Sequence, residues 1–197
     1  FDGGYWEKSE ELFNSIKAAS FDDLVLPPAL GEELQKDLPR FFAARETYER
    51  YGVPWKRGVL RIGPPGNGKT HAVKAMVNRL NVPCLYVKSL EACDGENACI
   101  RKVFQRARHN QPCLVVLEDI DSLITDKNRS FFLNELDGFA SNTGVVVIAT
   151  TNHPERLDPS ILDRPSRFDR KFYFELPAAD ERLRYARRWD DALRTEM

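Results

Sequence analysis

The segment GVLRIGPPGNGKT, at residues 58–70, constrains the fold of this chain more than any other feature. A short apolar run leads into a loop where Gly63, Gly68, Lys69 and Thr70 satisfy the pattern G-x-x-x-x-G-K-[ST]. Glycines let backbone N–H groups point inward at phosphate oxygens, and the start of a helix adds partial positive charge. Because this loop lies between a predicted strand and a predicted helix, we interpret it as a phosphate site rather than a glycine-rich turn with a coincidental Lys-Thr pair.

Each part of the loop has a predicted role. The Lys69 ammonium is expected to reach the β- and γ-phosphates, and the Thr70 hydroxyl is expected to bind Mg²⁺. The residues predicted to bind the nucleotide are Gly63, Pro64, Pro65, Gly66, Asn67, Gly68, Lys69, Thr70 and His71.

Apolar runs alternate with helical patterns along most of the chain. We predict strands at 58–63, 84–89, 113–121, 144–152 and 171–177, and helices at 69–80, 96–110 and 129–139. Strands that read as near-continuous apolar runs indicate a parallel sheet covered on both faces. Right-handed crossovers then make this a doubly wound, five-stranded α/β domain. Arg61 is a charge inside a predicted central strand, and the sequence does not explain it.

Two further helices flank this pattern. Residues 29–52 are predicted to form a helix with an internal break at Pro39. The last stretch, 179–197, is predicted to be a charged helix with Leu183, Ala186, Trp189 and Leu193 on one face. A helix with an apolar face needs a partner, so we expect it to begin a second, truncated domain.

Composition excludes several classes of function. Lys plus Arg is 29 and Asp plus Glu is 30 in 197 residues, so the net charge of −1 argues against a nucleic-acid-binding polycation. The four cysteines form no C-x-x-C pair and the three histidines lack metal-ligand spacing, so no zinc site is expected. No apolar run approaches the about 20 residues of a membrane span. Residues 1–12 do not resemble a signal peptide. We expect an intracellular protein, cytoplasmic by default, with the organelle left open because the chain starts at Phe1 rather than Met.

The predicted strand 113–121 ends in an acidic pair, Glu118-Asp119. Carboxylates at the carboxyl end of a parallel strand face the same crevice as the phosphate loop. One carboxylate can complete a Mg²⁺ shell while the other polarises the attacking water. The alternative is a solvated strand end. Asp121, two residues on, is expected to be structural.

From about residue 22 to its end, the chain resembles the AAA family of ATPases, within the AAA+ superfamily. GPPGNGKT resembles the Walker A loop, LVVLEDID the Walker B strand and NELDGF a segment that signals between subunits. ATTN, with Asn152, resembles sensor 1, and LDPSILDRPSRFDRKF resembles the second region of homology. The resemblance implies the strand order 5-1-4-3-2 of a P-loop NTPase. It also implies an N-terminal extension at 1–21, a nucleotide-binding core at 22–178 and the first helix of a mostly missing lid at 179–197.

The resemblance also implies an activity. It predicts Mg²⁺-dependent ATP binding and hydrolysis, with release of ADP, coupled in a ring, usually a hexamer, to remodelling of an unidentified protein or complex. Glu118 takes the metal role, Asp119 the role of general base, and Asn152 lies next to the attacking water. Arg164 and Arg167 reach into the neighbouring subunit's nucleotide site.

Local ion pairs are the alternative for these two arginines. Their expected partners are then Asp163 or Asp169, and for Arg170 we prefer this interpretation.

Two departures from the family pattern matter. The usual Walker B pair is Asp-Glu, whereas here it is Glu118-Asp119, an order also found in the AAA subgroup that translocates a folded iron–sulfur protein in mitochondria. The aromatic-apolar-Gly pore loop is not evident after the second strand, because residues 91–94 contain no aromatic side chain. We therefore expect remodelling of a folded partner rather than threading of an unfolded chain.

Other interpretations remain open. An ATP-binding regulatory or scaffold module with little hydrolysis is the first alternative, and a P-loop kinase or helicase is the second, without an acceptor lid or strand contacts in the sequence. The basic cluster within 101–109 is interpreted as a solvated helix face rather than a nucleic-acid contact. An aromatic group is interpreted as core packing or a subunit interface. Its members are Phe41, Phe42, Tyr48, Tyr51 and Trp55.

Overall fold

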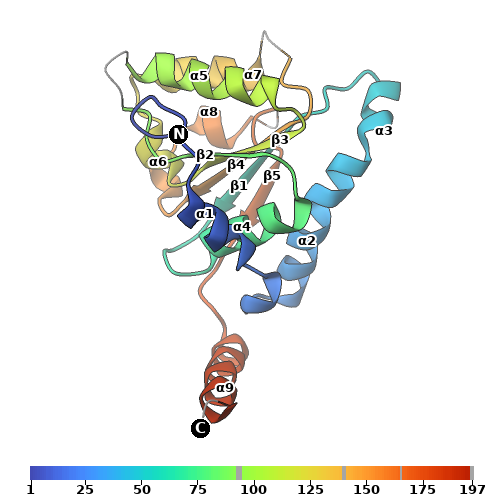
Figure 1. The fold of residues 1–197 in the computed structure, drawn as a ribbon, viewed down its shortest axis with the longest axis vertical. Helices are drawn as coiled ribbons and strands as arrows, with labels where there is room; N and C mark the ends of the chain where they lie inside the picture. The colour runs from blue at the N-terminus through green and yellow to red at the C-terminus, as the bar shows by residue number, and fades with distance from the viewer. Residues whose placement is uncertain (92–94, 139–140, 165, 196–197) are drawn as a thin grey trace.

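The computed structural model describes residues 1–91, 95–138, 141–164 and 166–195. Its centre is a five-stranded parallel sheet in the order β2-β3-β4-β1-β5 (Figure 1). The strands are β1 (Arg57–Ile62), β2 (Cys84–Val87), β3 (Cys113–Leu117), β4 (Val145–Thr151) and β5 (Arg170–Tyr173). This is the predicted order 5-1-4-3-2 read from the opposite edge, so the predicted doubly wound fold is confirmed.

Helices cover both faces of the sheet (Figure 1). One face carries α5 (Glu96–His109), α6 (Ile120–Leu123), α7 (Arg129–Asp137) and α8 (Pro159–Leu162). The other carries α1 (Glu10–Lys17), α2 (Pro28–Ala43) and α4 (Lys69–Leu80), with α3 (Arg45–Arg50) beyond α2. Two short 3₁₀ turns, η1 (Phe21–Asp23) and η2 (Pro154–Arg156), complete the connections.

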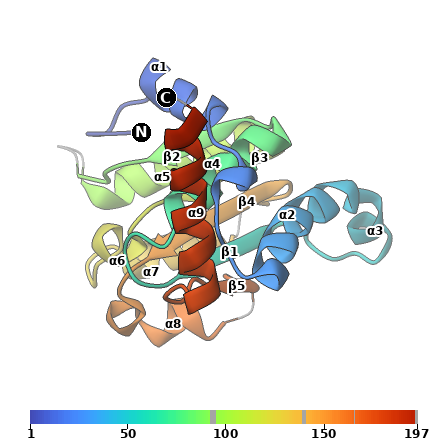
Figure 2. The same cartoon turned by 90° about the horizontal axis from the view of Figure 1, so that it is seen from below.

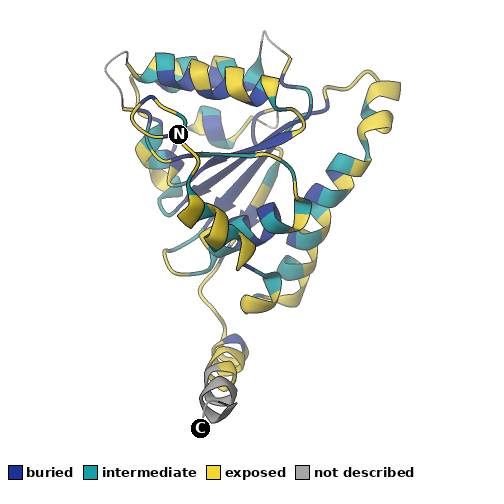
Figure 3. Cartoon of the chain, in the orientation of Figure 1, coloured by how far each residue is buried: buried dark blue, intermediate teal, exposed yellow. Residues whose placement is uncertain are grey.

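Strand side chains alternate between the two cores. On β1, Val59 packs with α2 and α4, whereas Leu60 packs with α5 and α7. The inner strands β1, β3 and β4 are buried almost throughout, whereas the edge strands β2 and β5 are only partly buried (Figure 3). This double burial is why they read as continuous apolar runs in the sequence.

The predicted break at Pro39 is wrong. Helix α2 continues through Pro39 to Ala43, and the interruption falls at Ala44, before α3. An internal proline costs a helix about 3 kcal/mol. Leu34, Leu38 and Phe41 on the same helix are buried, and burial contributes about 1.5–3 kcal/mol for each such side chain. Packing against the core therefore outweighs the proline.

Part of the aromatic group packs in this core, as predicted. The rings of Phe41 and Trp55 stack with centroids 5.6 Å apart, and the Trp55 Nε1–H donates to the Phe41 carbonyl oxygen at 3.0 Å. Tyr51 differs, because 73% of it is exposed.

Helix α9 (Ala179–Thr195) projects from the body of the domain (Figures 1 and 2). The Arg188 guanidinium holds it to η1 by donating to the Asp22 carbonyl and to Asp23 Oδ1, the latter at 2.7 Å. Leu183, on the predicted apolar face, is half exposed. The side chains of Trp189 and Leu193 lie outside the described set. Among the described residues, no helix has the length and apolar character needed to cross a membrane.

Candidate functional site

The phosphate loop lies at the carboxyl edge of the sheet, between β1 and α4. Helix α4 begins at Lys69 and ends at Leu80, as the sequence predicts. Gly68 is its N-cap and has a φ of 87°, a left-handed conformation that costs glycine little. A Cβ at Gly68 would lie 2.7 Å from Leu24 Cδ2. The Leu24 side chain, from the segment after η1, therefore packs directly against Gly68, where α4 begins.

The Lys69 ammonium folds back over this loop. Its Nζ donates to the carbonyl oxygens of Gly63 at 2.6 Å and Pro64 at 2.7 Å, and the residue is 6% exposed. Burial lowers the pKa of Lys69, and the nearby charges of Asp119 and Glu118 oppose that shift. The acidic pair and the lysine thus belong to one electrostatic site.

The remaining loop residues have different surroundings. Asn67 Nδ2 donates to the Glu175 carbonyl oxygen at 2.7 Å and ties the loop to the chain after β5. Thr70 is exposed in the first turn of α4. His71 Nε2 lies 3.0 Å from the Ser20 carbonyl oxygen, so this ring contacts the N-terminal segment.

The two acidic residues differ in their surroundings. Glu118 is partly buried, accepts a hydrogen bond from the Tyr86 hydroxyl at Oε2, and has an Oε1 atom that is buried without a hydrogen-bond partner among the described residues. Burial is the largest cause that raises the pKa of Tyr86, followed by its bond to Glu118. Asp119 is exposed, with a left-handed φ of 48°.

Asp119 is held on two sides by β4 and the residue after it. Its N–H donates to Thr150 Oγ1 at 3.1 Å, and its Oδ1 accepts from Asn152 Nδ2 at 2.9 Å. The structure thus brings together the sensor-like asparagine and the second carboxylate of the acidic pair. Asp121 accepts a hydrogen bond from Thr151 Oγ1 at 2.6 Å, consistent with its predicted structural role.

The two predicted finger arginines lie elsewhere, before β5. Arg167 is 6% exposed; its guanidinium donates to both Asp137 oxygens, at 2.8 to 3.2 Å, and to the Ser160 carbonyl. Arg164 is exposed, and its side chain has no ion-pair or hydrogen-bond partner within the described ranges. Arg167 therefore makes a local ion pair, although with neither of the two aspartates considered from the sequence.

Arg170 also makes local ion pairs, as preferred from the sequence. Its partners are Glu33 and Asp37 of α2, the latter at 3.1 Å, rather than Asp163 or Asp169. The difference arises because β5 lies beside β1, under α2.

Sequence reasoning missed three residues around the acidic pair. Tyr86 has no motif to mark it, and Thr150 lies in the ATTN segment, of which only Asn152 was singled out. Both reach the pair because β2 and β4 flank β3. Arg61 stood out as a strand charge but without a partner. In the structure it is 1% exposed, and its Nη1 donates to the Lys69 carbonyl oxygen at 3.3 Å.

The oxygen atoms near the phosphate loop suit a Mg²⁺ ion that also binds phosphate. Mg²⁺ prefers oxygen ligands and is usually held by one or two protein groups, with phosphates and waters completing its shell. The Thr70 hydroxyl and the unpartnered Glu118 Oε1 are such oxygens. The described residues contain no cluster of three or more His, Cys, Asp or Glu side chains able to hold a metal without added ligands.

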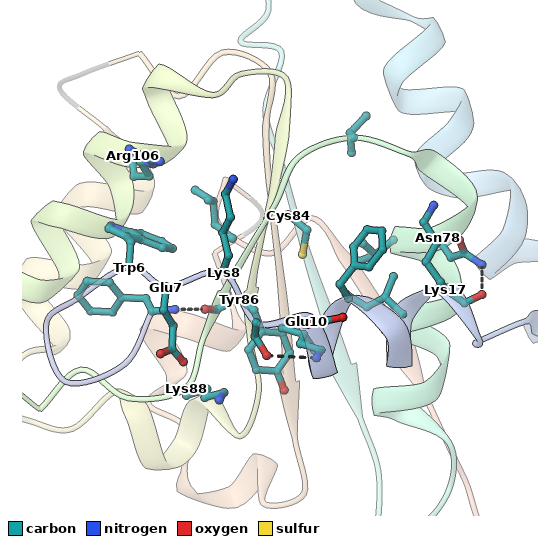
Figure 4. Close-up of a pocket in the computed structure, with 18 of the residues that line it drawn as sticks. Trp6, Glu7, Lys8, Glu10, Lys17, Asn78, Cys84, Tyr86, Lys88 and Arg106 are labelled. Atoms are coloured by element: carbon teal, nitrogen blue, oxygen red, sulfur yellow. Dashed lines mark hydrogen bonds between the residues drawn. The ribbon is translucent and has the colours of Figure 1, made fainter.

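A separate cavity of about 890 Å³ lies between the N-terminal segment and the edge of β2 (Figure 4). Trp6, Cys84, Tyr86 and Lys88 are among its lining residues. The Phe1 and Lys88 backbones are joined there by a 2.9 Å hydrogen bond. Tyr86 is shared between this cavity and the acidic pair.

Comparison with known proteins agrees with this geometry. Residues 59–176, more than half of the chain, match the sequence profile of the family described as "ATPase family associated with various cellular activities (AAA)". An ATP-dependent zinc metalloprotease FtsH of Acidothermus cellulolyticus is 39% identical over 72% of this chain and 24% of its own length. The ribosome biogenesis ATPase RIX7 of Saccharomyces cerevisiae is 37% identical over 70% of this chain and 18% of its own length.

A third relative is an uncharacterized AAA domain-containing protein of Schizosaccharomyces pombe, 32% identical over 88% of this chain and 24% of its own length. The chain thus spans about a quarter or less of the length of these relatives. The profile match covers the phosphate loop, the acidic pair and the segment with Arg164 and Arg167. This chain belongs to the AAA family of ATPases.

Proposed function

We propose that this chain is the nucleotide-binding core of an AAA protein that hydrolyses ATP in a site shared between neighbouring subunits. The observation that carries the proposal is the hydrogen bond from Asn152 to Asp119, formed beside the buried ammonium of Lys69. It joins a phosphate-binding group, a carboxylate and an orienting amide at one edge of the sheet. Membership of the AAA family supports ATP binding and hydrolysis as the general activity.

Binding relies on the loop and the first turn of α4. Lys69 supplies positive charge at the loop, and the α4 N-terminus directs free N–H groups toward the phosphates. Thr70 and Glu118 would hold the Mg²⁺, which when bound neutralises the phosphate charge. Asn67 keeps the loop fixed to the end of β5.

Asp119 is the better candidate for the general base. It is exposed, whereas Glu118 is partly buried and hydrogen-bonded to Tyr86. Asn152 fixes one Asp119 oxygen and leaves the other to accept a proton from the attacking water. This division of roles supports the assignment of Glu118 to the metal and Asp119 to the water.

The arginines support a shared site. Both precede β5 in the chain, and the Arg167 backbone lies at the amino end of β1, where a Cβ on Gly58 would be 1.7 Å from the Arg167 carbonyl oxygen. The phosphate loop follows the carboxyl end of β1, about 20 Å away along the six residues of that strand. In this proposal the exposed Arg164 stabilises phosphoryl charge in a neighbour's site, and Arg167, bound to Asp137, positions the segment that carries it. A site completed by a neighbour requires a ring, with a hexamer as the expected form.

Hydrolysis is coupled, in this proposal, to remodelling of a protein or complex. Support comes from relatives named as an ATP-dependent protease and as a ribosome biogenesis ATPase. The prediction about a non-aromatic pore loop concerns residues 91–94, of which 92–94 lie outside the described residues.

A pair of matched aspartate variants tests the hydrolytic role. Asp119→Asn should keep ADP and ATP binding but lower turnover by about 100-fold or more, the typical contribution of a general base. Asp121→Asn makes the same chemical change two residues away and should keep most of the turnover. Equal turnover for Asp119→Asn and the unaltered chain would contradict the proposal.

Assembly is tested by measuring ATP turnover per subunit against protein concentration. A shared site predicts a steep rise, and Arg164→Ala should abolish the rise without weakening nucleotide binding. A flat, high specific activity would contradict the shared site. A nucleotide-binding module with little hydrolysis is the second candidate, favoured by an Asp119 side chain one methylene shorter than the usual glutamate. It would give tight ADP binding with low turnover at every concentration.

A further inference from the structure

Arg61 is a buried charge that the phosphate site alone does not account for. It lies near the carboxyl end of β1, an inner strand of the sheet, and it is 1% exposed. It shares a face with Val59, which packs against α2 and α4. Its Nη1 donates to the Lys69 carbonyl oxygen at 3.3 Å, and its Nε is buried with no hydrogen-bond partner among the described residues. A guanidinium in such a place needs an opposite charge nearby.

The strand register identifies that charge. Arg61 lies opposite Thr150 on β4, and the next strand, β3, pairs Leu117 with Ala149. Continuing this register by one residue sets Glu118 beside Thr150, in the same row and on the same face as Arg61. Two strand spacings separate the Arg61 and Glu118 backbones by about 10 Å, which their two long side chains can bridge.

Charge and burial agree with this placement. Burial lowers the pKa of Arg61 to about 10, and Glu118 is the carboxylate that opposes this shift most strongly. The Glu118 Oε1 atom is itself buried without a hydrogen-bond partner among the described residues. Two incompletely satisfied groups of opposite charge therefore lie on one side of the sheet.

Tyr86 contacts Glu118 from β2, the strand that flanks β3 on the side away from β1. It lies on β2, opposite Val116 of β3, and its hydroxyl donates to Glu118 Oε2. Tyr86 also lines the cavity under the N-terminal segment (Figure 4). Side chains from β1 and β2 thus converge on the carboxylate that follows β3.

We propose that Arg61 and Tyr86 are positioning residues that hold the Glu118 carboxylate at the metal position and link it to the first turn of α4. A glutamate is one methylene longer than the aspartate usual at this position, so its carboxylate has more rotamers to explore. The Tyr86 hydroxyl restrains one oxygen and the Arg61 charge attracts the other. This proposal rests on the proposed function, because that function assigns Glu118 to Mg²⁺.

The first test needs no nucleotide. Urea unfolding is measured for Arg61→Met, Glu118→Gln and the double variant. Arg61→Met should lower the unfolding midpoint, and in the Glu118→Gln background the drop should be at most half as large. Equal drops in both backgrounds would overturn the coupling between the two residues. Tyr86→Phe removes only a hydroxyl, and its own cycle with Glu118→Gln tests the second positioning contact even if Arg61→Met does not fold.

The second test measures ADP affinity with Mg²⁺ and with EDTA. The ratio of the two dissociation constants should shrink at least threefold in Tyr86→Phe and in Arg61→Met. Arg57→Met is the matched control, because Arg57 lies on the same face of β1 but pairs with Asp37 at 2.9 Å. It should leave the ratio unchanged.

An unchanged ratio in Tyr86→Phe and Arg61→Met would overturn the positioning role. If the unaltered chain bound no ADP, the proposed function would fail, while the unfolding cycle would still decide whether Arg61 and Glu118 are coupled.

Discussion

Gly58 lies where β1 meets the backbone of residues 167 and 168. Replacing Gly58 with alanine should weaken the fold. A Cβ at this position would lie 1.7 Å from the Arg167 carbonyl oxygen and 3.0 Å from Phe168 Cα. The Gly58 N–H also donates to Asp169 Oδ1 at 2.9 Å. Both clashing atoms belong to backbone, so no side-chain rotation relieves the overlap. The segment 167–169 must move away from the sheet.

The cost can be worked from these contacts. Overpacking costs about 1–3 kcal/mol, and a clash with backbone belongs at the upper end. Alanine recovers about 0.5–1 kcal/mol of the conformational entropy that glycine loses in a strand. The expected net loss is therefore about 2 kcal/mol, a large part of the about 5–15 kcal/mol that stabilises a domain.

Urea unfolding followed by tryptophan fluorescence measures this loss. Gly31→Ala is the matched control, because Gly31 lies in α2 and a Cβ there meets nothing within 4 Å. It should raise stability by about 0.5–1 kcal/mol, so the two alanine variants should differ by about 3 kcal/mol. A Gly58→Ala midpoint at or above that of the unaltered chain would refute the close packing of residue 167 on β1.

Three further predictions concern other parts of the domain. Arg167→Ala should cost about 2 kcal/mol in urea unfolding, because it leaves Asp137 without its partner, whereas the exposed Arg164→Ala should stay within about 0.5 kcal/mol. Trp55→Phe should cost about 1–2 kcal/mol by the same measurement, since the Phe41 carbonyl loses a buried donor. Burial raises the pKa of Cys84 from 9.0 to about 12, so mass spectrometry should find Cys84 unmodified by iodoacetamide at pH 8. Because that thiol is neutral when folded, its contribution to stability is complete below pH 9 and falls as pH rises toward 12.

The local part of the fold was predictable. The strand, the glycine loop and the start of the helix lie within the 13 residues 58–70, and α4 begins and ends where the sequence predicts. The alternation of apolar strands and helices indicated the doubly wound class because both faces of the inner strands are buried. The strand order came from the resemblance to the AAA family, since periodicity does not say which strands are neighbours.

Contacts between distant residues were not predictable. The Arg167 partner, Asp137, is 30 residues away, and Asp163 and Asp169, the nearby aspartates considered instead, do not bind it. Tyr86 and Glu118 are 32 residues apart and meet only because β2 and β3 are paired. Pro39 was misjudged because the burial of Leu34, Leu38 and Phe41 is a property of the packed helix rather than of the local sequence.

The ion pairs of this chain also separate its two finger candidates. Arg167 uses its guanidinium to hold Asp137 at the end of α7 and the Ser160 carbonyl at the start of α8, and it is buried in doing so. To reach a neighbouring nucleotide it would have to break that ion pair, whereas Arg164 is already exposed. In a ring, Arg164 is therefore the residue that can enter the neighbour's site without a rearrangement. Arg167 contributes by joining the end of α7 to the start of α8.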